Sequence, residues 1–313
     1  MNNIICIAGP TASGKTKLAG ELAKMTNGEV VSCDSMQIYR KMDIGTAKPT
    51  KEEIARVPHH LIDICEPDED FSAAVFAERA QSAIKDVFLR GKVPVLCGGT
   101  GLYLDALLRG GNSAPSFDTS DIRAKLSLRA ENEGVFALYE ELLRVDPESA
   151  ASIHPNNVKR VIRALEIYIA SGEKKSELDK RSKELESPYD ARVIYLNYLN
   201  RVILYRRIDS RVDFMIKEGL VEETRALMSE RAFELNRTAS QAIGYKELFG
   251  FIEGRESLES AIENLKRATR RYAKRQITWF SAKDYILPLD ADDDNGLKTF
   301  EEIVNNAKKL FSV

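Results

Sequence analysis

The stretch Gly9-Pro10-Thr11-Ala12-Ser13-Gly14-Lys15-Thr16 matches the phosphate-binding loop pattern G-x-x-x-x-G-K-[ST]. It follows an apolar run at residues 4–8, typical of a buried strand, and precedes residues with the period of a helix. In such a loop the glycines let backbone N–H groups face phosphate oxygens, and the lysine adds positive charge. The hydroxyl at the last position is suited to Mg²⁺. We therefore predict that these eight residues bind a polyphosphate, with Thr16 as a ligand of a Mg²⁺ cofactor.

Two further apolar runs predict strands, and polar residues follow each of them. Residues 29–33 lead into Asp34, and residues 93–97 lead into Gly98-Gly99-Thr100. Ligands in open α/β sheets bind outside the carboxyl ends of the strands, so we expect Lys15, Asp34 and Thr100 to face one crevice. No carboxylate follows the second run, unlike the metal-binding strand of a nucleotide hydrolase. The pattern favours a transferase in which Asp34 takes a proton from the acceptor, although an aspartate there also suits a helix N-cap.

The distribution of apolar residues indicates how the chain is organised. Residues 1–110 alternate short strands with helical stretches, as in a parallel sheet covered by helices on both faces. Residues 110–116 read as a linker, 120–170 as helices, 171–190 as a polar mobile segment and 192–196 as a strand that returns to the sheet. We predict an α/β fold with a P-loop, nucleoside-kinase-like core from residues 1–112 and 191–313, the last part helical. Residues 113–190 form a helical insertion domain.

The bulk composition describes an ordinary globular protein of 313 residues, with 43% apolar residues and a mean hydropathy of −0.30. No run approaches the roughly 20 apolar residues that span a bilayer, and no cleavable leader precedes the first strand. The four cysteines lack metal-ligand spacing, which favours buried reduced thiols in a cytosolic protein. The adjacent His59 and His60 lack a third ligand. We expect a cytoplasmic monomer that does not bind membranes.

The net charge of −2 conceals an uneven distribution of charge. Residues 255–283 carry eight Lys and Arg against three Glu, whereas the residues from 284 onward are acidic. Such a basic stripe suits an RNA-binding surface, and it also suits a solvated helix face.

The chain resembles the tRNA dimethylallyltransferases, a family of enzymes that prenylate tRNA. The resemblance covers nearly the whole chain, with the motifs in the right order. Eukaryotic relatives often carry a C-terminal zinc finger, which this sequence does not show, so we expect the bacterial form. The segments that carry it are Gly9–Thr16, Asp34–Tyr39, Met42–Pro49, Gly98–Tyr103, His154–Arg160, Arg163–Glu166, Gly244–Glu247 and Ala273–Trp279.

This resemblance implies a reaction and a set of site residues. The enzyme would transfer a dimethylallyl group from dimethylallyl pyrophosphate to N6 of the adenine that follows the anticodon of tRNA, releasing pyrophosphate. Asp34 matches the general base of the family, and Arg211 matches an arginine that binds pyrophosphate. Thr100 and Arg123 match positions that contact tRNA, the former near the reacting base. The predicted catalytic residues are therefore Asp34 and Thr100.

Several short segments are candidates for contact with RNA. Around residues 157–163 the chain departs from the common family pattern. Asn157 stands where the family commonly has an aspartate, and Lys159 stands where it usually has a glutamine. The lysine favours contact with phosphate. The predicted tRNA-binding residues are Asp34, Ser35, Met36, Gln37, Thr100, Arg123, Lys159, Arg160, Val161, Ile162, Arg163, Lys274, Arg275 and Gln276.

Three other functions share parts of these patterns. A small-molecule or nucleoside kinase has the same loop and core, and an adenine-nucleotide isopentenyltransferase performs similar chemistry on a free nucleotide. An RNA-binding module with an unused phosphate loop is the non-enzymatic alternative. The helical insertion and the basic C-terminal helix argue against a small kinase, which needs neither.

Overall fold

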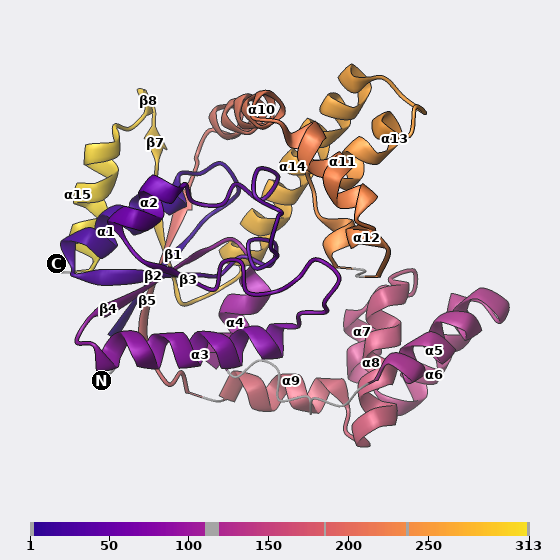
Figure 1. The fold of residues 1–313 in the computed structure, drawn as a ribbon. Helices are drawn as coiled ribbons and strands as arrows, with labels where there is room; N and C mark the ends of the chain where they lie inside the picture. Colours follow the sequence, from indigo (N-terminus) through magenta and orange to yellow (C-terminus); the bar gives the residue numbers. More distant parts are fainter. Residues whose placement is uncertain (1–2, 110–118, 185, 236–237, 312–313) are drawn as a thin grey trace. The chain divides into compact units, whose positions relative to one another are not determined.

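The computed structural model describes residues 3–109, 119–184, 186–235 and 238–311 (Figure 1). The chain forms two compact units, one made of Met1–Leu107 and Pro188–Val313 and the other of Leu108–Ser187. The linker predicted at residues 110–116 lies outside the described residues.

A six-stranded sheet forms the centre of the first unit. All neighbouring strands are parallel, in the order β3-β2-β4-β1-β5-β6. From β1 the chain forms β2 and the edge strand β3, and it then returns to place β4 between β2 and β1. It next adds β5 and β6 on the other side of β1, so the order of the strands changes direction beside β1. Open α/β sheets bind ligands at this type of position. The strands are β1 (Asn3–Ala8), β2 (Gly28–Ser32), β3 (His59–His60), β4 (Val93–Gly98), β5 (Asp190–Asn197) and β6 (Ile286–Asp290).

Helices cover both faces of this sheet, which confirms the predicted α/β fold. Helices α1 (Lys15–Met25) and α15 (Phe300–Phe311) lie on one face, and α3 (Ala73–Leu89) and α4 (Gly101–Arg109) lie on the other (Figure 1). Ile5 and Ile7 of β1 pack with Leu18 of α1, whereas Ile4 and Cys6 are buried on the opposite face. Strands buried on both faces read as continuous apolar runs, as the sequence showed.

The C-terminal part of the first unit is helical. Helices α10 (Arg201–Lys217) and α14 (Leu258–Ser281) are joined by two ion pairs. One joins Arg270 to Asp209, and the other joins Lys266 to Asp213. None of the helices in the described parts of the chain is long and apolar enough to cross a membrane. The remaining elements of this unit are α2 (Lys51–Arg56), α11 (Leu220–Ser229), α12 (Ala232–Leu235), η1 (Ala239–Gln241), η2 (Lys246–Leu248), α13 (Phe249–Ile252), β7 (Asp292–Asp293) and β8 (Gly296–Leu297).

The second unit is a small helical bundle. The expectation of a mobile segment at residues 171–190 was wrong, because its middle forms helix α9. The buried carboxylate of Asp146 explains this order, since it accepts hydrogen bonds from the backbone N–H of Ser176 at 3.0 Å and from its hydroxyl at 2.6 Å. The helices are α5 (Ser120–Asn132), α6 (Val135–Val145), α7 (Pro147–Ser152), α8 (Val158–Ser171) and α9 (Lys175–Glu184).

A buried carboxylate also stabilises the edge of the sheet. Glu29 of β2 is 1% exposed and pairs with Arg90, with Lys92 at 2.7 Å and with His60 at 2.7 Å. These hydrogen bonds hold the pKa of Glu29 well below its usual value of 4.5, and the bond from Arg90 makes the largest contribution. His60 therefore has a carboxylate partner at the edge of the sheet.

We expect Glu29→Gln to lower the free energy of unfolding at neutral pH by about 2 kcal/mol. This loss is smaller than the loss from breaking an ion pair in which both partners are buried, because the cations around Glu29 keep contact with water. A carboxylate with a lowered pKa stabilises the fold fully above its unfolded pKa, so the difference should shrink as the pH falls below 4.5. Urea unfolding at several pH values measures it, with the exposed Glu78→Gln as the control. Equal stability of the two variants at pH 7 would contradict the assignment.

Candidate active site

The phosphate loop connects β1 to α1 in an unusual backbone conformation. Ala12 and Gly14 have positive φ angles of 62° and 94°, and the N–H of Ser13 donates to the carbonyl of Pro10 at 3.2 Å. Gly9 admits no side chain, because a Cβ there would lie 2.7 Å from the Ser13 hydroxyl oxygen and 3.2 Å from Leu196 Cβ. The loop therefore turns its backbone toward the start of α1, where unpaired N–H groups and the helix dipole favour an anion.

Two partly buried cations lie beside this loop. Burial lowers the pKa of Lys15, while Cys97 and Asp34 act to raise it and Arg211 lowers it further. Burial likewise lowers the pKa of Arg211, against the attraction of Asp34. Lys15 retains some exposed surface, yet enough protein surrounds its ammonium group to disfavour the charge. Two cations held close together in spite of these costs suit a ligand that carries several negative charges.

Arg207, a second arginine on α10, makes a hydrogen bond to the backbone of the phosphate loop. The Nε atom of Arg207 donates to the carbonyl of Ala12 at 2.9 Å, and the hydroxyl of Tyr198 donates to the carbonyl of Ser13 at 2.8 Å. Arg207 also acts to lower the pKa of Arg211, four residues further along the same helix. Arg207 received no role in the sequence analysis; its position four residues before Arg211, on the same face of one helix, was the available signal.

Asp34 and Thr100 come together at the ends of β2 and β4. The Thr100 hydroxyl accepts a hydrogen bond from the backbone N–H of Ser35 at 3.1 Å, and an Asp34 carboxylate oxygen accepts one from the N–H of Met36 at 2.9 Å. Residues 35–38 form a turn, so the carboxylate does not cap a helix. Its partly exposed position beside Lys15 leaves it accessible to an acceptor.

Gln276 of α14 connects the phosphate loop to the loop after β4. Its side-chain oxygen accepts from the N–H of Thr11 at 2.9 Å, and its side-chain nitrogen donates to the carbonyl of Gly99 at 3.0 Å. The residue is only 5% exposed. Both ends of the amide are therefore occupied by the protein, which gives Gln276 a structural role at the site, and its contact with RNA stays a prediction.

Tyr272 of α14, which the sequence analysis did not single out, also belongs to this site. Its phenol lies close enough to the side chains of Thr100 and Gln276 for both to act on its pKa, in the direction that lowers it. Burial, followed by the nearby charge of Asp34, raises the pKa of this phenol. Tyr272 therefore stays protonated beside the candidate base.

Gln37, another predicted RNA contact, makes hydrogen bonds within the protein. It is 9% exposed, accepts a hydrogen bond from the Ser32 hydroxyl at 2.9 Å, and donates to the carbonyls of Thr46 and Ala47. Its side chain is thus committed to the protein, whereas Asp34, Ser35 and Met36 remain partly exposed.

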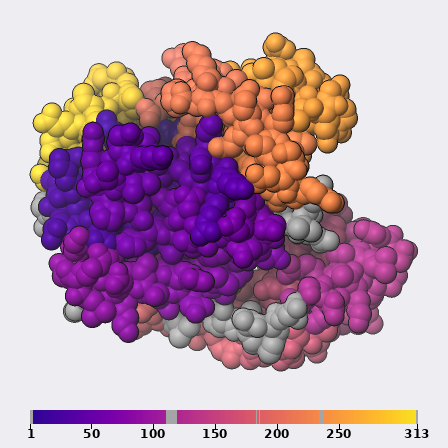
Figure 2. All heavy atoms as spheres, in the orientation of Figure 1, coloured from indigo at the N-terminus to yellow at the C-terminus, as the bar shows by residue number. Residues whose placement is uncertain are grey.

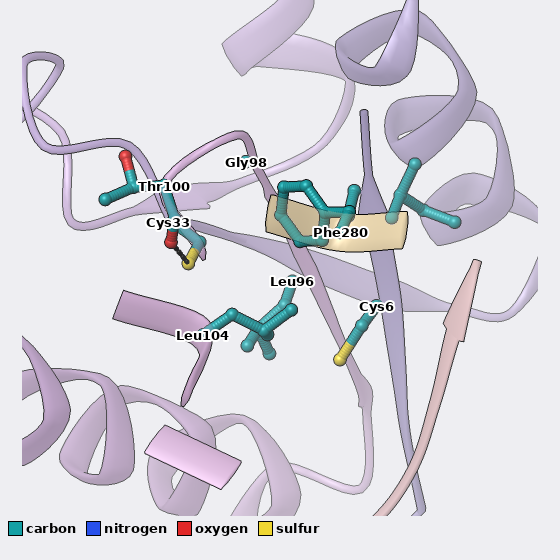
Figure 3. Close-up of a pocket in the computed structure, with 9 residues that line it drawn as sticks. Cys6, Cys33, Leu96, Gly98, Thr100, Leu104 and Phe280 are labelled. Atoms are coloured by element: carbon teal, nitrogen blue, oxygen red, sulfur yellow. Dashed lines mark hydrogen bonds between the residues drawn. The ribbon is translucent and has the colours of Figure 1, made fainter. Parts of the chain in front are cut away.

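A small cavity lies beneath Thr100, on the face of the sheet covered by α4 and α14 (Figure 3). Figure 3 shows Phe280 and Leu104 on either side of it and the thiols of Cys6 and Cys33 along its wall. It has space for about one water molecule, too little for a five-carbon prenyl chain.

All four cysteines are buried and free, as expected. Burial raises the pKa of Cys97 to about 11, although Lys15 and a hydrogen bond from the Thr16 side chain oppose the shift. These thiols are therefore protonated and unreactive at neutral pH.

In the second unit, a buried glutamate holds two of the predicted RNA-binding arginines. Glu166 of α8 is fully buried and pairs with Arg123 at 2.8 Å and with Arg163 at 2.6 Å. Both guanidinium side chains remain about half exposed, at 51% and 44%. Their charges are thus fixed in place at the surface.

The other residues of this predicted segment divide by burial. Lys159 and Arg160 are exposed, whereas Val161 and Ile162 are buried in the core of the unit. The side chains of the two apolar residues pack in the core, so the predicted contact of this segment with RNA would use its exposed residues. Asn157 is the N-cap of α8, where it replaces aspartate without loss of the capping bond to the N–H of Arg160.

Comparison with known proteins identifies the family. The family model for IPP transferases matches residues 37–283. A tRNA dimethylallyltransferase from Caldanaerobacter subterraneus subsp. tengcongensis is 49% identical over 304 residues, which cover 97% of this chain and 95% of that relative. One from Halalkalibacterium halodurans is 47% identical over 308 residues, 96% of this chain and 95% of that relative.

Solved structures agree with this similarity. The full-length tRNA isopentenylpyrophosphate transferase from Bacillus halodurans superposes with a TM-score of 0.73 at 43% identity, over 100% of this chain and 96% of that one. A eukaryotic dimethylallyltransferase described as acting on tRNA gives a TM-score of 0.79 at 32% identity, over 94% of this chain and 75% of that one. The chain therefore belongs to the IPP transferase family, and its relatives are tRNA dimethylallyltransferases.

Proposed function

We propose that this enzyme transfers a dimethylallyl group from dimethylallyl pyrophosphate to N6 of the adenine adjacent to the 3′ side of the anticodon in tRNA, as a cytoplasmic monomer. The observation that carries this proposal is the meeting of Lys15, Arg211 and Asp34. Two partly buried cations suit a pyrophosphate, and a neighbouring carboxylate suits an acceptor that must lose a proton.

In the proposed reaction, the lone pair of adenine N6 forms a bond to C1 of the dimethylallyl group. The bond between C1 and the pyrophosphate oxygen breaks, and its electron pair leaves with the pyrophosphate. The proton from N6 passes to the carboxylate of Asp34. Lys15 and Arg211 offset the negative charge that develops on the leaving group, so their contribution is larger in the transition state than in the bound substrate.

Mg²⁺ fits this site only together with the substrate. No cluster of three His, Cys, Asp or Glu side chains suited to a metal occurs in the described parts of the chain. The hydroxyl of Thr16 is a single oxygen ligand, and Mg²⁺ commonly takes most of its other ligands from substrate phosphates and water. When bound through Thr16, the ion would supply further charge neutralisation to the pyrophosphate.

Exposed cations on each unit are proposed to bind the tRNA backbone. Lys274 and Arg275 are exposed on α14 of the first unit, and Lys159 and Arg160 are exposed on α8 of the second. Arg123 and Arg163, held by Glu166, extend the second group. Contacts of this kind neutralise phosphates and release counterions, so they fix tRNA without reading its sequence.

An assay with labelled dimethylallyl pyrophosphate and tRNA, AMP or no acceptor tests the proposal. We expect transfer to tRNA alone. Transfer to AMP would indicate an adenine-nucleotide isopentenyltransferase, and ATP turnover stimulated by a small acceptor would indicate a kinase. Binding of RNA without any transfer would support the non-enzymatic alternative.

The proposed RNA surface predicts a dependence on salt. Lys159→Ala and Lys274→Ala should each weaken tRNA binding and reduce the slope of log affinity against log salt by roughly 0.7–0.9, because each removes one phosphate contact. Affinity for dimethylallyl pyrophosphate should not change. Titrations across a salt series measure both quantities, with Lys309→Ala on α15 as the control. If the slopes equal that of the control, the cations are solvated and the RNA binds elsewhere.

A further inference from the structure

A carboxylate from α11 holds a turn that lies far away in the sequence. Glu223 accepts hydrogen bonds from three consecutive backbone N–H groups, those of Asp43 at 3.1 Å, Ile44 at 2.9 and 3.0 Å and Gly45 at 3.1 Å. The surface view shows the N-terminal residues, in violet, directly beside the orange residues of this helical region (Figure 2). The turn at residues 42–47 is therefore built onto α11.

A buried tyrosine completes this arrangement. The hydroxyl of Tyr245 donates to Glu223 at 2.7 Å, and its side chain has no exposed surface. Its ring fills the space beside Gly45, where a Cβ would lie 2.5 Å from Cζ of the tyrosine. Burial, followed by the charge of Glu223, raises the pKa of Tyr245, so the phenol remains a donor. Four donors thus converge on one carboxylate, which has acceptor sites for all of them.

The other side of the turn supports the segment that carries Asp34. The side-chain nitrogen of Gln37 donates to the carbonyls of Thr46 at 3.3 Å and Ala47 at 3.2 Å, and its oxygen accepts from the Ser32 hydroxyl at 2.9 Å. Ser32 and Gln37 lie on either side of Asp34 in the sequence. The turn is therefore in direct contact with the segment whose carboxylate is the proposed base.

We propose that Glu223 is a positioning residue for the reaction, which sets the place of Asp34 through the turn at residues 42–47 and Gln37. This inference rests on the proposed function of Asp34. A carboxylate is required because it only accepts hydrogen bonds. A glutamine at the same place has one acceptor oxygen and turns an NH₂ group toward backbone N–H groups, so it cannot satisfy the same four donors.

The test is Glu223→Gln, compared with Glu222→Gln, an exposed neighbour on the same helix. We expect kcat for tRNA prenylation to fall roughly 10²-fold, as expected when a reacting group moves by about 1 Å, with KM for dimethylallyl pyrophosphate within about threefold of the wild type. Hydrogen–deuterium exchange of the folded protein should become faster at residues 42–48. Tyr245→Phe, which removes one donor of the four, should have a smaller effect in the same direction.

Two results would overturn the inference. The first is that Glu223→Gln shows faster hydrogen–deuterium exchange at residues 42–48 yet keeps the wild-type kcat. The second is that the loss of activity is explained by weaker binding of dimethylallyl pyrophosphate alone. If Glu223→Gln does not fold, the same two measurements on Tyr245→Phe decide the question. Failure of the proposed function is distinguishable, because the wild-type enzyme itself would then transfer no prenyl group to tRNA.

Discussion

Replacing Asp34 by asparagine should lower the single-turnover rate of tRNA prenylation by roughly 10²–10⁴-fold, the usual contribution of a general base. Asparagine has nearly the same shape, and its oxygen can still accept the hydrogen bond from the N–H of Met36. It cannot take the proton that N6 loses when the new bond forms. The turn should therefore persist while the chemical step slows.

The measurement is a rapid-quench assay with enzyme in excess over labelled tRNA, together with a titration of tRNA affinity. Affinity should stay within a few-fold of the wild type, because the carboxylate acts on the proton and not on the phosphate backbone. Asp68→Asn, on an exposed loop of the same unit, is the matched control. A loss confined to KM, with an intact rate at saturation, would reduce Asp34 to a binding contact.

The sequence predicted the parts of the site that depend on local patterns. The phosphate loop is contained in eight consecutive residues between a strand and a helix, so its conformation follows from its own composition. The proximity of Asp34 to Lys15 followed from a general property of parallel sheets, whose strands end at one edge. Neither inference required knowledge of a contact between distant side chains.

The sequence did not reveal the hydrogen bonds that polar side chains make within the protein. Gln276 was expected to contact RNA, but it bonds the backbone of Thr11, 265 positions away, and nothing in its neighbourhood distinguishes the two roles. The same holds for Gln37. Helix α9 was missed for a related reason, because Asp146, far upstream, supplies the bonds that order its first turn.

Removing the charge of Lys15 should have the next largest effect. We expect Lys15→Ala to raise the Kd for dimethylallyl pyrophosphate by about 10²-fold, since hydrogen bonds to charged groups contribute about 1.5–3 kcal/mol each. The substitution also removes the hydrogen bond that Lys15 Nζ donates to the Pro10 carbonyl at 3.4 Å. The loop should persist, because Arg207, Tyr198 and Gln276 still bond the backbone of residues 11–13. Lys17→Ala, two residues further along α1, is the matched control; its ammonium group lies over the ring of Phe300.

The lowered pKa of Lys15 adds a dependence on pH to this prediction. In the free enzyme burial favours the neutral amine, so the proton is lost at a pH below the usual 10.5. A bound pyrophosphate favours the charged form and raises that pKa again. By linkage, affinity for the ligand should fall as the pH rises from the pKa of the free enzyme to that of the complex. Calorimetric titration at alkaline pH should show this fall in the wild type and in Lys17→Ala but not in Lys15→Ala. An equal fall in all three proteins would assign the titration to another group and leave Lys15 without a direct role in binding pyrophosphate.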